Sequence, residues 1–120
     1  MQSNKGSGTK PELILASLLR KKLILSELPG RPDFIYPKAR LAVFVHGDWW
    51  HRNPKLNLPM PRRHRAFWAR KFARNVERDF LVKEELEAMG WRVLVVWESE
   101  VKADPKGVAR RIKFAALQRV

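Results

Sequence analysis

Hydrophobic residues recur with a helical period in three parts of the chain. The first, from about 10 to 22, follows the capping-box sequence TKPE and places its leucines on one face. The longest spans about 66–89, where apolar side chains recur every three to four positions, and Gly90 is its expected C′ residue. The last covers about 105–119. These spacings predict three helices with one apolar face each.

Four shorter apolar runs have the composition of strands. Residues 40–46 and 91–97 are almost continuously apolar, which is typical of strands buried on both faces. Residues 23–28 and 33–36 are shorter, and a tight turn joins 33–36 to 40–46, so these two are expected to pair as an antiparallel hairpin. The predicted order is α-β-β-β-α-β-α, an α/β fold with a small mixed β-sheet flanked by helices.

Two segments have no regular period. Residues 1–8 are polar and contain two glycines, which predicts a flexible N-terminal arm. From Gly47 to Arg65 the chain holds three prolines and two asparagines, which predicts a long loop after strand 40–46. A chain of 120 residues has room for one hydrophobic core, so 9–120 is expected to form a single domain.

The charge of the chain points to a polyanionic partner. Lys and Arg number 25 against 12 Asp and Glu, a formal net charge of +13, and this balance favours nucleic acid. No acidic residue lies between Asp48 and Glu77, whereas basic residues are frequent there. A solvated face normally mixes both signs, so we expect this stretch to contact phosphate. The candidate DNA-binding residues are Arg52, Arg62, Arg63, Arg65, Lys71 and Arg74.

Other classes of protein are disfavoured by what the sequence lacks. It has no cysteine, which excludes disulfides and cysteine-based zinc sites. No apolar run approaches the roughly 20 residues that span a bilayer, and the N-terminus lacks a signal-peptide core. We therefore expect a cytoplasmic, nucleoid-associated protein. Charge alone leaves a basic binding protein without catalytic activity open.

Carboxylate and imidazole groups gather where the predicted hairpin strands end. Asp33 follows a proline at the start of one strand; such a residue often caps a turn, but it can also bind Mg²⁺. Antiparallel pairing would bring it beside Val45 and His46. The carbonyl of Val45 is then a second candidate metal ligand. His46 and His51 are candidates for action through water or as a general base.

Three further side chains have two interpretations each. Glu12 can close the capping box by binding the Thr9 amide, or it can face the metal, and its spacing favours neither. Trp49 and Trp50 lie in the predicted loop. One ring is expected to seal the core, while an exposed partner would stack on DNA bases or wedge between them.

Four sequence blocks, in order, resemble the very short patch repair (Vsr) mismatch endonucleases. They are LPGRPDF at 28–34, VFVHGDWWH at 43–51, FWARKFARNVERD at 67–79 and LEAMGWRVLVVWE at 86–98. The similarity is collinear from about 9 to 98. It implies a restriction-endonuclease-like fold, Mg²⁺-dependent nicking of duplex DNA, and incision beside the thymine of a T:G mismatch.

The resemblance also implies roles for residues at matching positions. Asp33 supplies the metal carboxylate and Val45 a main-chain carbonyl. Glu12 and His46 act through water around the metal, and His51 is the general base. The aromatic pair after His46 intercalates beside the mismatch.

The rest of the resemblance concerns support and partners. Asn75 and Asp79 match a family block and are expected to support the site or hold phosphate. The chain is expected to act as a monomer, and a mismatch-repair protein is a conceivable partner by resemblance only.

The chain departs from the family at the structural zinc site. Asp48 and Ser99 stand at cysteine positions, and Asn53 and Lys55 replace the remaining histidine and cysteine. We therefore predict no structural zinc. The link between the first helix and residue 28 is also shorter than the resemblance to the family implies. Because both changes touch regions that shape mismatch recognition, two alternatives stay open: a nuclease with another DNA substrate, and a non-catalytic DNA-binding protein.

Overall fold

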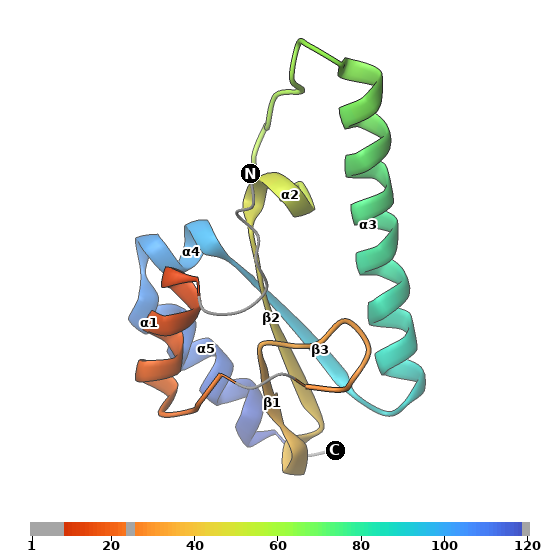
Figure 1. Cartoon of the computed structure of the whole chain (residues 1–120). Helices are drawn as coiled ribbons and strands as arrows, with labels where there is room; N and C mark the ends of the chain where they lie inside the picture. The colour runs from red at the N-terminus through yellow and green to blue at the C-terminus, as the bar shows by residue number, and fades with distance from the viewer. Residues whose placement is uncertain (1–8, 24–25, 119–120) are drawn as a thin grey trace.

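The computed structural model describes residues 9–23 and 26–118, and in them helices flank a three-stranded sheet (Figure 1). In chain order the elements are α1 (Lys10–Leu19), β1 (Phe34–Tyr36), the 3-10 turn η1 (Pro37–Ala39), β2 (Leu41–His46), α2 (Asp48–His51), α3 (Arg65–Ala88), β3 (Arg92–Trp97), α4 (Glu98–Ala103) and α5 (Pro105–Leu117). None of the helices within the described ranges is long and apolar enough to cross a bilayer.

Strand β2 lies in the centre of the sheet. It pairs antiparallel with β1, with Phe34 opposite Val43, and parallel with β3, with Val45 opposite Val96. Five of its six residues are buried, as expected of a strand covered on both faces. The predicted hairpin is therefore confirmed, and the parallel pairing of β2 with β3 makes the sheet mixed.

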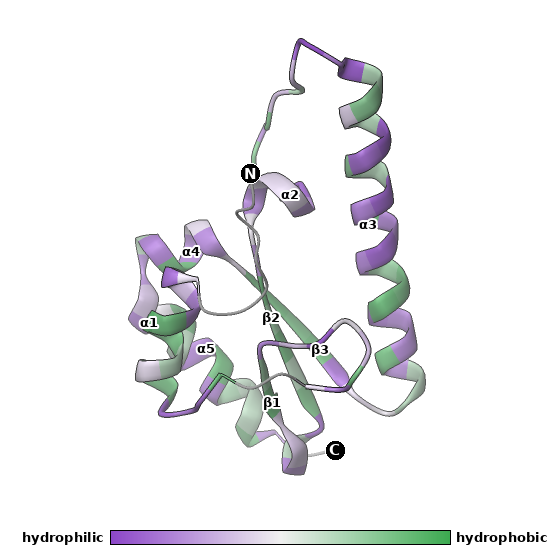
Figure 2. Ribbon diagram, in the orientation of Figure 1, coloured by the Kyte–Doolittle hydropathy of each residue, from purple (hydrophilic) through white to green (hydrophobic). Residues whose placement is uncertain are grey.

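Each face of the sheet packs against its own helices. On one face, Val43 and Val96 join a core that includes Leu15 of α1 and Ile112 of α5. On the other face, Ala42 and Phe44 of β2 pack with Leu86 of α3. Figure 2 shows the hydrophobic strands between these layers, and hydrophilic residues along much of α3. The α/β class with a small mixed sheet flanked by helices is confirmed, and it is the arrangement expected of a restriction-endonuclease-like fold.

The segment after α1 differs from the prediction. Helix α1 ends at Leu19, because Arg20 adopts a left-handed conformation with φ 57°. The strand expected over 23–28 is wrong for the part that the structure describes, since Leu23 and 26–28 form no strand. The Ser26 hydroxyl instead accepts a hydrogen bond from the Leu28 amide. Residues 24 and 25, and the predicted arm at 1–8, lie outside the described residues.

Two short helices were not expected. The predicted loop over 47–65 begins with α2, and α4 precedes the last helix. Helix α2 spans four residues and α4 six, so neither is long enough to show an apolar period. Helix α3 matches its prediction closely, and Gly90 follows it with φ 91°. The C′ assignment of Gly90 is therefore confirmed.

The apolar face of α3 is only partly covered. Phe72 is 3% exposed, but Val76 is 46% and Phe80 57% exposed, although all three share the predicted face. Phe72 packs against Trp49 of α2 and Leu86 packs on the sheet, whereas Val76 and Phe80 lie between these two contacts. Val76 and Phe80 line a cleft instead of the core.

Gly30 provides a first testable prediction, since its backbone has φ 75° and an added Cβ would lie 2.5 Å from Val82 Cγ1. Gly30→Ala should lower the free energy of unfolding by about 2–4 kcal/mol, through backbone strain and steric overlap. Chemical denaturation measures the change. Gly47→Ala is the control, because φ there is −72° and the added Cβ would meet Glu98 at 3.6 Å. Equal losses in both variants would contradict the steric explanation.

Candidate active site

A cleft of about 950 Å³ lies between the end of β2 and the middle of α3. Its wall includes five candidate catalytic or supporting residues selected from the sequence, which come from five separate elements or strand ends. They are Glu12, Asp33, His46, His51 and Asp79. The strand ends deliver two of these side chains, while α1, α2 and α3 each deliver one.

Asp33 is fixed against the end of β2. Its amide donates to the Val43 carbonyl at 2.9 Å, and its Oδ2 accepts from the Val45 amide at 2.7 Å. Burial raises the pKa of the Asp33 carboxyl to about 7, assisted by the neighbouring Glu12 carboxyl and opposed by the Val45 hydrogen bond. A cation beside Asp33 would favour its charged form.

Glu12 closes the capping box and also lies next to Asp33. The capping box is present: the Thr9 amide donates to Glu12 Oε1, and the Glu12 amide donates to Thr9 Oγ1, each at 3.4 Å. The Glu12 side chain is 3% exposed and also lies within hydrogen-bonding reach of Asp33. The cap therefore holds a second carboxyl next to Asp33.

The oxygen atoms around Asp33 suit a hard divalent cation. Backbone groups alternate in direction along a strand, so the Val45 carbonyl faces the same edge as its amide, which binds Asp33. With the carboxyls of Asp33 and Glu12, this carbonyl forms an oxygen-rich group of the kind that Mg²⁺ prefers. The residues present therefore fit this ion.

His46 and His51 lie as stacked rings beside this oxygen group. Their ring centroids are 3.8 Å apart and their planes differ by 6°. Burial and the neighbouring His51 lower the pKa of His46 to about 4. His51 Nδ1 lies 2.6 Å from Asp79 Oδ2, a contact between residues 28 positions apart. If Nδ1 carries the proton, the Nε2 atom of His51 is free to accept another.

The same imidazoles form a second group of possible metal ligands. Nitrogen atoms of His46 and His51 and an oxygen of Asp79 all lie within 4.8 Å of one another. Two nitrogens suit zinc better than magnesium. The parallel stacking of the two rings, however, directs their in-plane lone pairs alongside one another rather than toward a common point. The oxygen group therefore suits a hard cation better than the imidazole group does.

The tryptophan pair lies on α2, not in an irregular loop, and both rings are half-buried. Trp49 packs edge-on against Phe72 at 5.3 Å, and Trp50 lies 6.0 Å from Trp68. The Asn75 side chain donates to the Trp50 carbonyl at 3.1 Å, so α3 also holds the backbone of α2. The sequence analysis missed Trp68 and Phe72 as partners of this pair.

Arg52 has a different environment from the other predicted DNA-binding residues. Its guanidinium lies 4.2 Å from the Phe72 ring centroid, and its Nη2 donates to the carbonyls of Leu58 and Pro59. These contacts hold the loop that follows α2, and the role of Arg52 in DNA binding stays a prediction.

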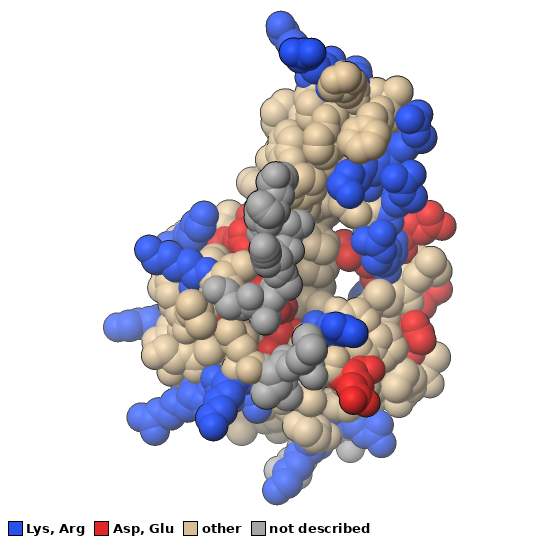
Figure 3. Space-filling model, viewed as in Figure 1, with Lys and Arg blue, Asp and Glu red and all other residues tan. Residues whose placement is uncertain are grey.

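The remaining basic residues are placed as expected. Lys71 lines the cleft and is half-buried, while the others are exposed on α3 and the loop before it: Arg62, Arg63, Arg65 and Arg74. Figure 3 shows Lys and Arg gathered over the upper part of α3 and the adjoining tip. This surface continues from the cleft and is positively charged.

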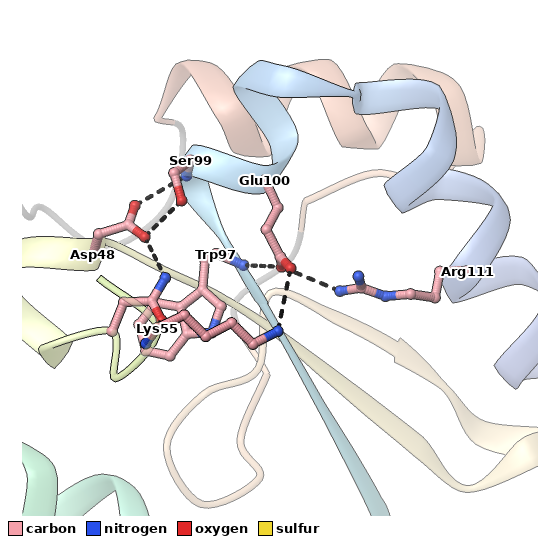
Figure 4. A network of polar contacts seen from close by, with 7 residues as sticks. Asp48, Lys55, Trp97, Ser99, Glu100 and Arg111 are labelled. Atoms are coloured by element: carbon pink, nitrogen blue, oxygen red, sulfur yellow. Dashed lines mark hydrogen bonds and ion pairs between the residues drawn. The ribbon is translucent and has the colours of Figure 1, made fainter. Parts of the chain in front are cut away.

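The positions of the family's zinc ligands hold a hydrogen-bonded network. Asp48 accepts from Asn53 at 2.7 Å and from the Ser99 hydroxyl at 2.7 Å (Figure 4). Lys55, at the fourth position, lies 4.0 Å from Glu100. An amide, a hydroxyl and an ammonium are poor zinc ligands, and the chain has no cysteine, so this donor set does not fit a tetrahedral structural zinc.

Comparison with known proteins indicates the family of this chain. The family model described as DNA mismatch endonuclease Vsr matches residues 1–55, which include Glu12, Asp33, His46 and His51. The type II nicking enzyme V.NmeDIP of Neisseria meningitidis serogroup C is 37% identical over 96% of this chain and 82% of its own length.

Two other relatives extend the comparison. The type II nicking enzyme V.NaeI of Lentzea aerocolonigenes is 40% identical over 87% of this chain and 68% of its own length. The DNA mismatch endonuclease Vsr of Escherichia coli (strain K12) is 40% identical over 68% of this chain and 52% of its own length. These matches and the geometry of the cleft lead to one conclusion: the chain belongs to the Vsr family of DNA endonucleases.

Proposed function

We propose that this endonuclease uses Mg²⁺ to nick one strand of duplex DNA at T:G mismatches. The carrying observation is the meeting of the Asp33 and Glu12 carboxyls with the His51–Asp79 pair in one cleft, beside a basic helix. The names of its relatives, nicking enzymes and a mismatch endonuclease, support the reaction and this class of substrate.

The proposed Mg²⁺ site is the oxygen group around Asp33. Asp33 and the carbonyl of Val45 would hold Mg²⁺, and Glu12 lies beside them. When bound, Mg²⁺ offsets negative charge on the phosphate undergoing cleavage and makes the attacking water more acidic. The Asp33–Val45 hydrogen bond at 2.7 Å orients this carboxylate in advance.

His51 is the proposed general base. Its Nε2 accepts the proton of the attacking water, while Nδ1 donates to Asp79. The Asp79 carboxylate both selects this tautomer and stabilises the imidazolium that forms. His46 stacks on the imidazole of His51 at 3.8 Å and restricts its tilt. We assign His46 a further role through water in the cleft.

The DNA is proposed to lie along α3. Lys71, Arg65 and Arg74, with the exposed Arg62 and Arg63, would contact phosphates, and each contact releases counterions. Trp50 lines the cleft and Trp49 precedes it on α2, and a ring of this pair can stack on an unpaired base or enter a base step. Their packing on α3 requires at least one ring to move from its present contacts.

We also propose a cellular location, an oligomeric state and a protein partner for the enzyme. The substrate places the enzyme at the nucleoid in the cytoplasm. We propose that it acts as a monomer, because the groups needed for hydrolysis all come from one chain. A mismatch-repair protein that recruits it is proposed by family resemblance.

A nicking assay tests the proposed function. The purified protein is incubated with a T:G duplex and a matched duplex of the same sequence, each with Mg²⁺ or with EDTA. We expect nicking beside the mismatched thymine, at least tenfold faster than in the matched duplex, and none in EDTA. Equal rates on both duplexes would overturn the mismatch substrate and favour a nickase with another recognition site. Absence of any Mg²⁺-dependent nicking would overturn the reaction itself.

A further inference from the structure

The short helix α2 carries His51 and both tryptophans, yet it has only one turn. A single turn is unstable in isolation, because nucleation costs more than one turn of hydrogen bonds returns. Its backbone bonds are His51 N to the Gly47 carbonyl at 3.1 Å and Asn53 N to the Asp48 carbonyl at 3.0 Å. External contacts must therefore hold α2 in place.

Contacts at the two ends of α2 differ in kind. On the α3 side, the turn is held by Asn75 at the Trp50 carbonyl and by aromatic packing. On the opposite side stands Asp48, the first residue of α2, whose side chain faces the start of α4. Both attachments lie within three residues of His51, the proposed general base.

The Asp48 carboxylate is saturated with hydrogen bonds. Its Oδ2 accepts from the Ser99 amide at 2.9 Å, and its Oδ1 accepts from the Ser99 hydroxyl and from Asn53 Nδ2, both at 2.7 Å. Asn53 is 3% exposed, and its own oxygen accepts from the Lys55 amide at 3.0 Å. Figure 4 shows these side chains converging between α2 and α4. We refer to Asp48, Asn53 and Ser99 as the polar clamp.

Electrostatics favour this geometry. Burial opposes ionisation of Asp48, but the hydrogen bonds from Asn53 and Ser99 outweigh it and hold the pKa of the carboxyl below its usual value. Hydrogen bonds to a charged acceptor are stronger than neutral ones. The clamp joins residues 51 positions apart in the sequence, across the carboxyl ends of β2 and β3.

We propose that Asp48 is a positioning residue: through the polar clamp it fixes α2 to α4 and so sets the place of His51 in the cleft. Three hydrogen bonds to one carboxylate, two of them from Ser99, thus join α2 to the start of α4. The effect on catalysis rests on the proposed function of His51, whereas the mechanical role of the clamp does not.

Four variants test this proposal. Asp48→Ala removes the clamp, and Ser99→Val removes the hydroxyl bond with a side chain of the same shape as that of Ser99→Thr. Ser99→Thr retains the hydroxyl and serves as the conservative rescue. Asp104→Ala is the matched control, because Asp104 caps α5 through Gly107 and has no contact with α2. Each carboxylate accepts a backbone hydrogen bond in the first turn of a helix, Asp48 from Ser99 of α4 and Asp104 from Gly107 of α5.

Two measurements separate positioning from general stability. In nicking assays, Asp48→Ala should lower kcat about 10–100-fold with KM nearly unchanged, because small misplacement of a base has effects of this size. Ser99→Val should show a smaller loss, Ser99→Thr almost none, and Asp104→Ala none. Hydrogen exchange should accelerate at the amides of His51 and Asn53 in Asp48→Ala, but not in Asp104→Ala.

The possible outcomes decide between explanations. Equal effects of Asp48→Ala and Asp104→Ala on kcat would show that lost stability is the cause and would overturn the proposal. Unchanged exchange at His51 in Asp48→Ala, or a raised KM at constant kcat, would overturn it too. If the wild-type protein nicks no duplex, the proposed function fails, and the exchange comparison still supports or overturns the clamp. Should Asp48→Ala fail to fold, the pair Ser99→Val and Ser99→Thr provides the same comparison.

Discussion

Asp33→Asn should reduce Mg²⁺-dependent nicking by at least about a thousandfold, since a neutral amide cannot replace a carboxylate that neutralises and holds the cation. Single-turnover assays with saturating enzyme measure the loss at the chemical step. The asparagine oxygen can still accept from the Val45 amide, so the fold should persist. DNA binding in EDTA should equal that of the wild-type protein. Residual nicking within tenfold of the wild-type rate would show that Asp33 is not the metal carboxylate.

In the absence of metal, Asp33→Asn should be more stable to unfolding than the wild-type protein. The folded pKa of Asp33, about 7, lies above its ordinary 3.8, so the stability linked to its proton is present below pH 3.8 and lost as the pH rises through 7. Asparagine cannot ionise and avoids this loss. The difference in unfolding free energy should grow from near zero at pH 4 to about 1–3 kcal/mol at pH 8.

Chemical denaturation of both proteins across this pH range measures the difference, and comparison at each pH removes the contribution of other groups. His46 is one such group: its lowered pKa, about 4, means that its stabilising contribution is present above 6.5 and lost as the pH falls through 4. Added Mg²⁺ should stabilise the wild-type protein more than the variant at pH 8. Stability curves that run parallel across the range would contradict a proton held by Asp33.

His51→Gln should lower kcat about a thousandfold, because removal of a general base forfeits the usual contribution of such a group. Asp79→Asn should have a smaller effect, about 10–100-fold, since His51 remains but loses the charge that orients and stabilises it. The double variant should be no slower than His51→Gln alone. Non-additivity of this kind is expected of residues that act as one unit.

The control for His51→Gln and Asp79→Asn is DNA binding measured at several salt concentrations without metal. Both variants should bind DNA as the wild-type protein does, because the phosphate contacts are proposed for other residues, on α3. Losses that multiply in the double variant would show that Asp79 acts independently of His51. Such a result would return Asp79 to the other role expected from its sequence block, which is contact with phosphate.

Much of the fold could be predicted from local patterns. Period alone predicted the long helix to within a residue or so at each end, and Gly90 marked its end. The hairpin that unites Asp33 with Val45 also follows from sequence, because adjacent strands joined by a tight turn have few ways to pair. The capping box located Glu12. In these cases the interacting residues are near in sequence or belong to neighbouring strands.

The strand expected over 23–28 shows the limit of this reasoning. Its apolar residues suited a strand, but strand formation also requires an edge with which to pair, and the Ser26 hydroxyl and the turn at Gly30 bind or redirect that backbone. Exposure of Val76 and Phe80 has a similar cause. Periodicity identifies one face of a helix, whereas burial depends on which elements pack against that face.

The sequence by itself determined the element order, the hairpin, the basic stretch and the list of groups able to perform hydrolysis. Only the tertiary structure decided how these groups combine: His51 with Asp79, Asp48 with Ser99, and Arg52 with the loop after α2. The physical reason is that these contacts join separate elements. Their partners depend on how helices pack across the sheet, and no local pattern of hydrophobic and polar residues encodes that packing.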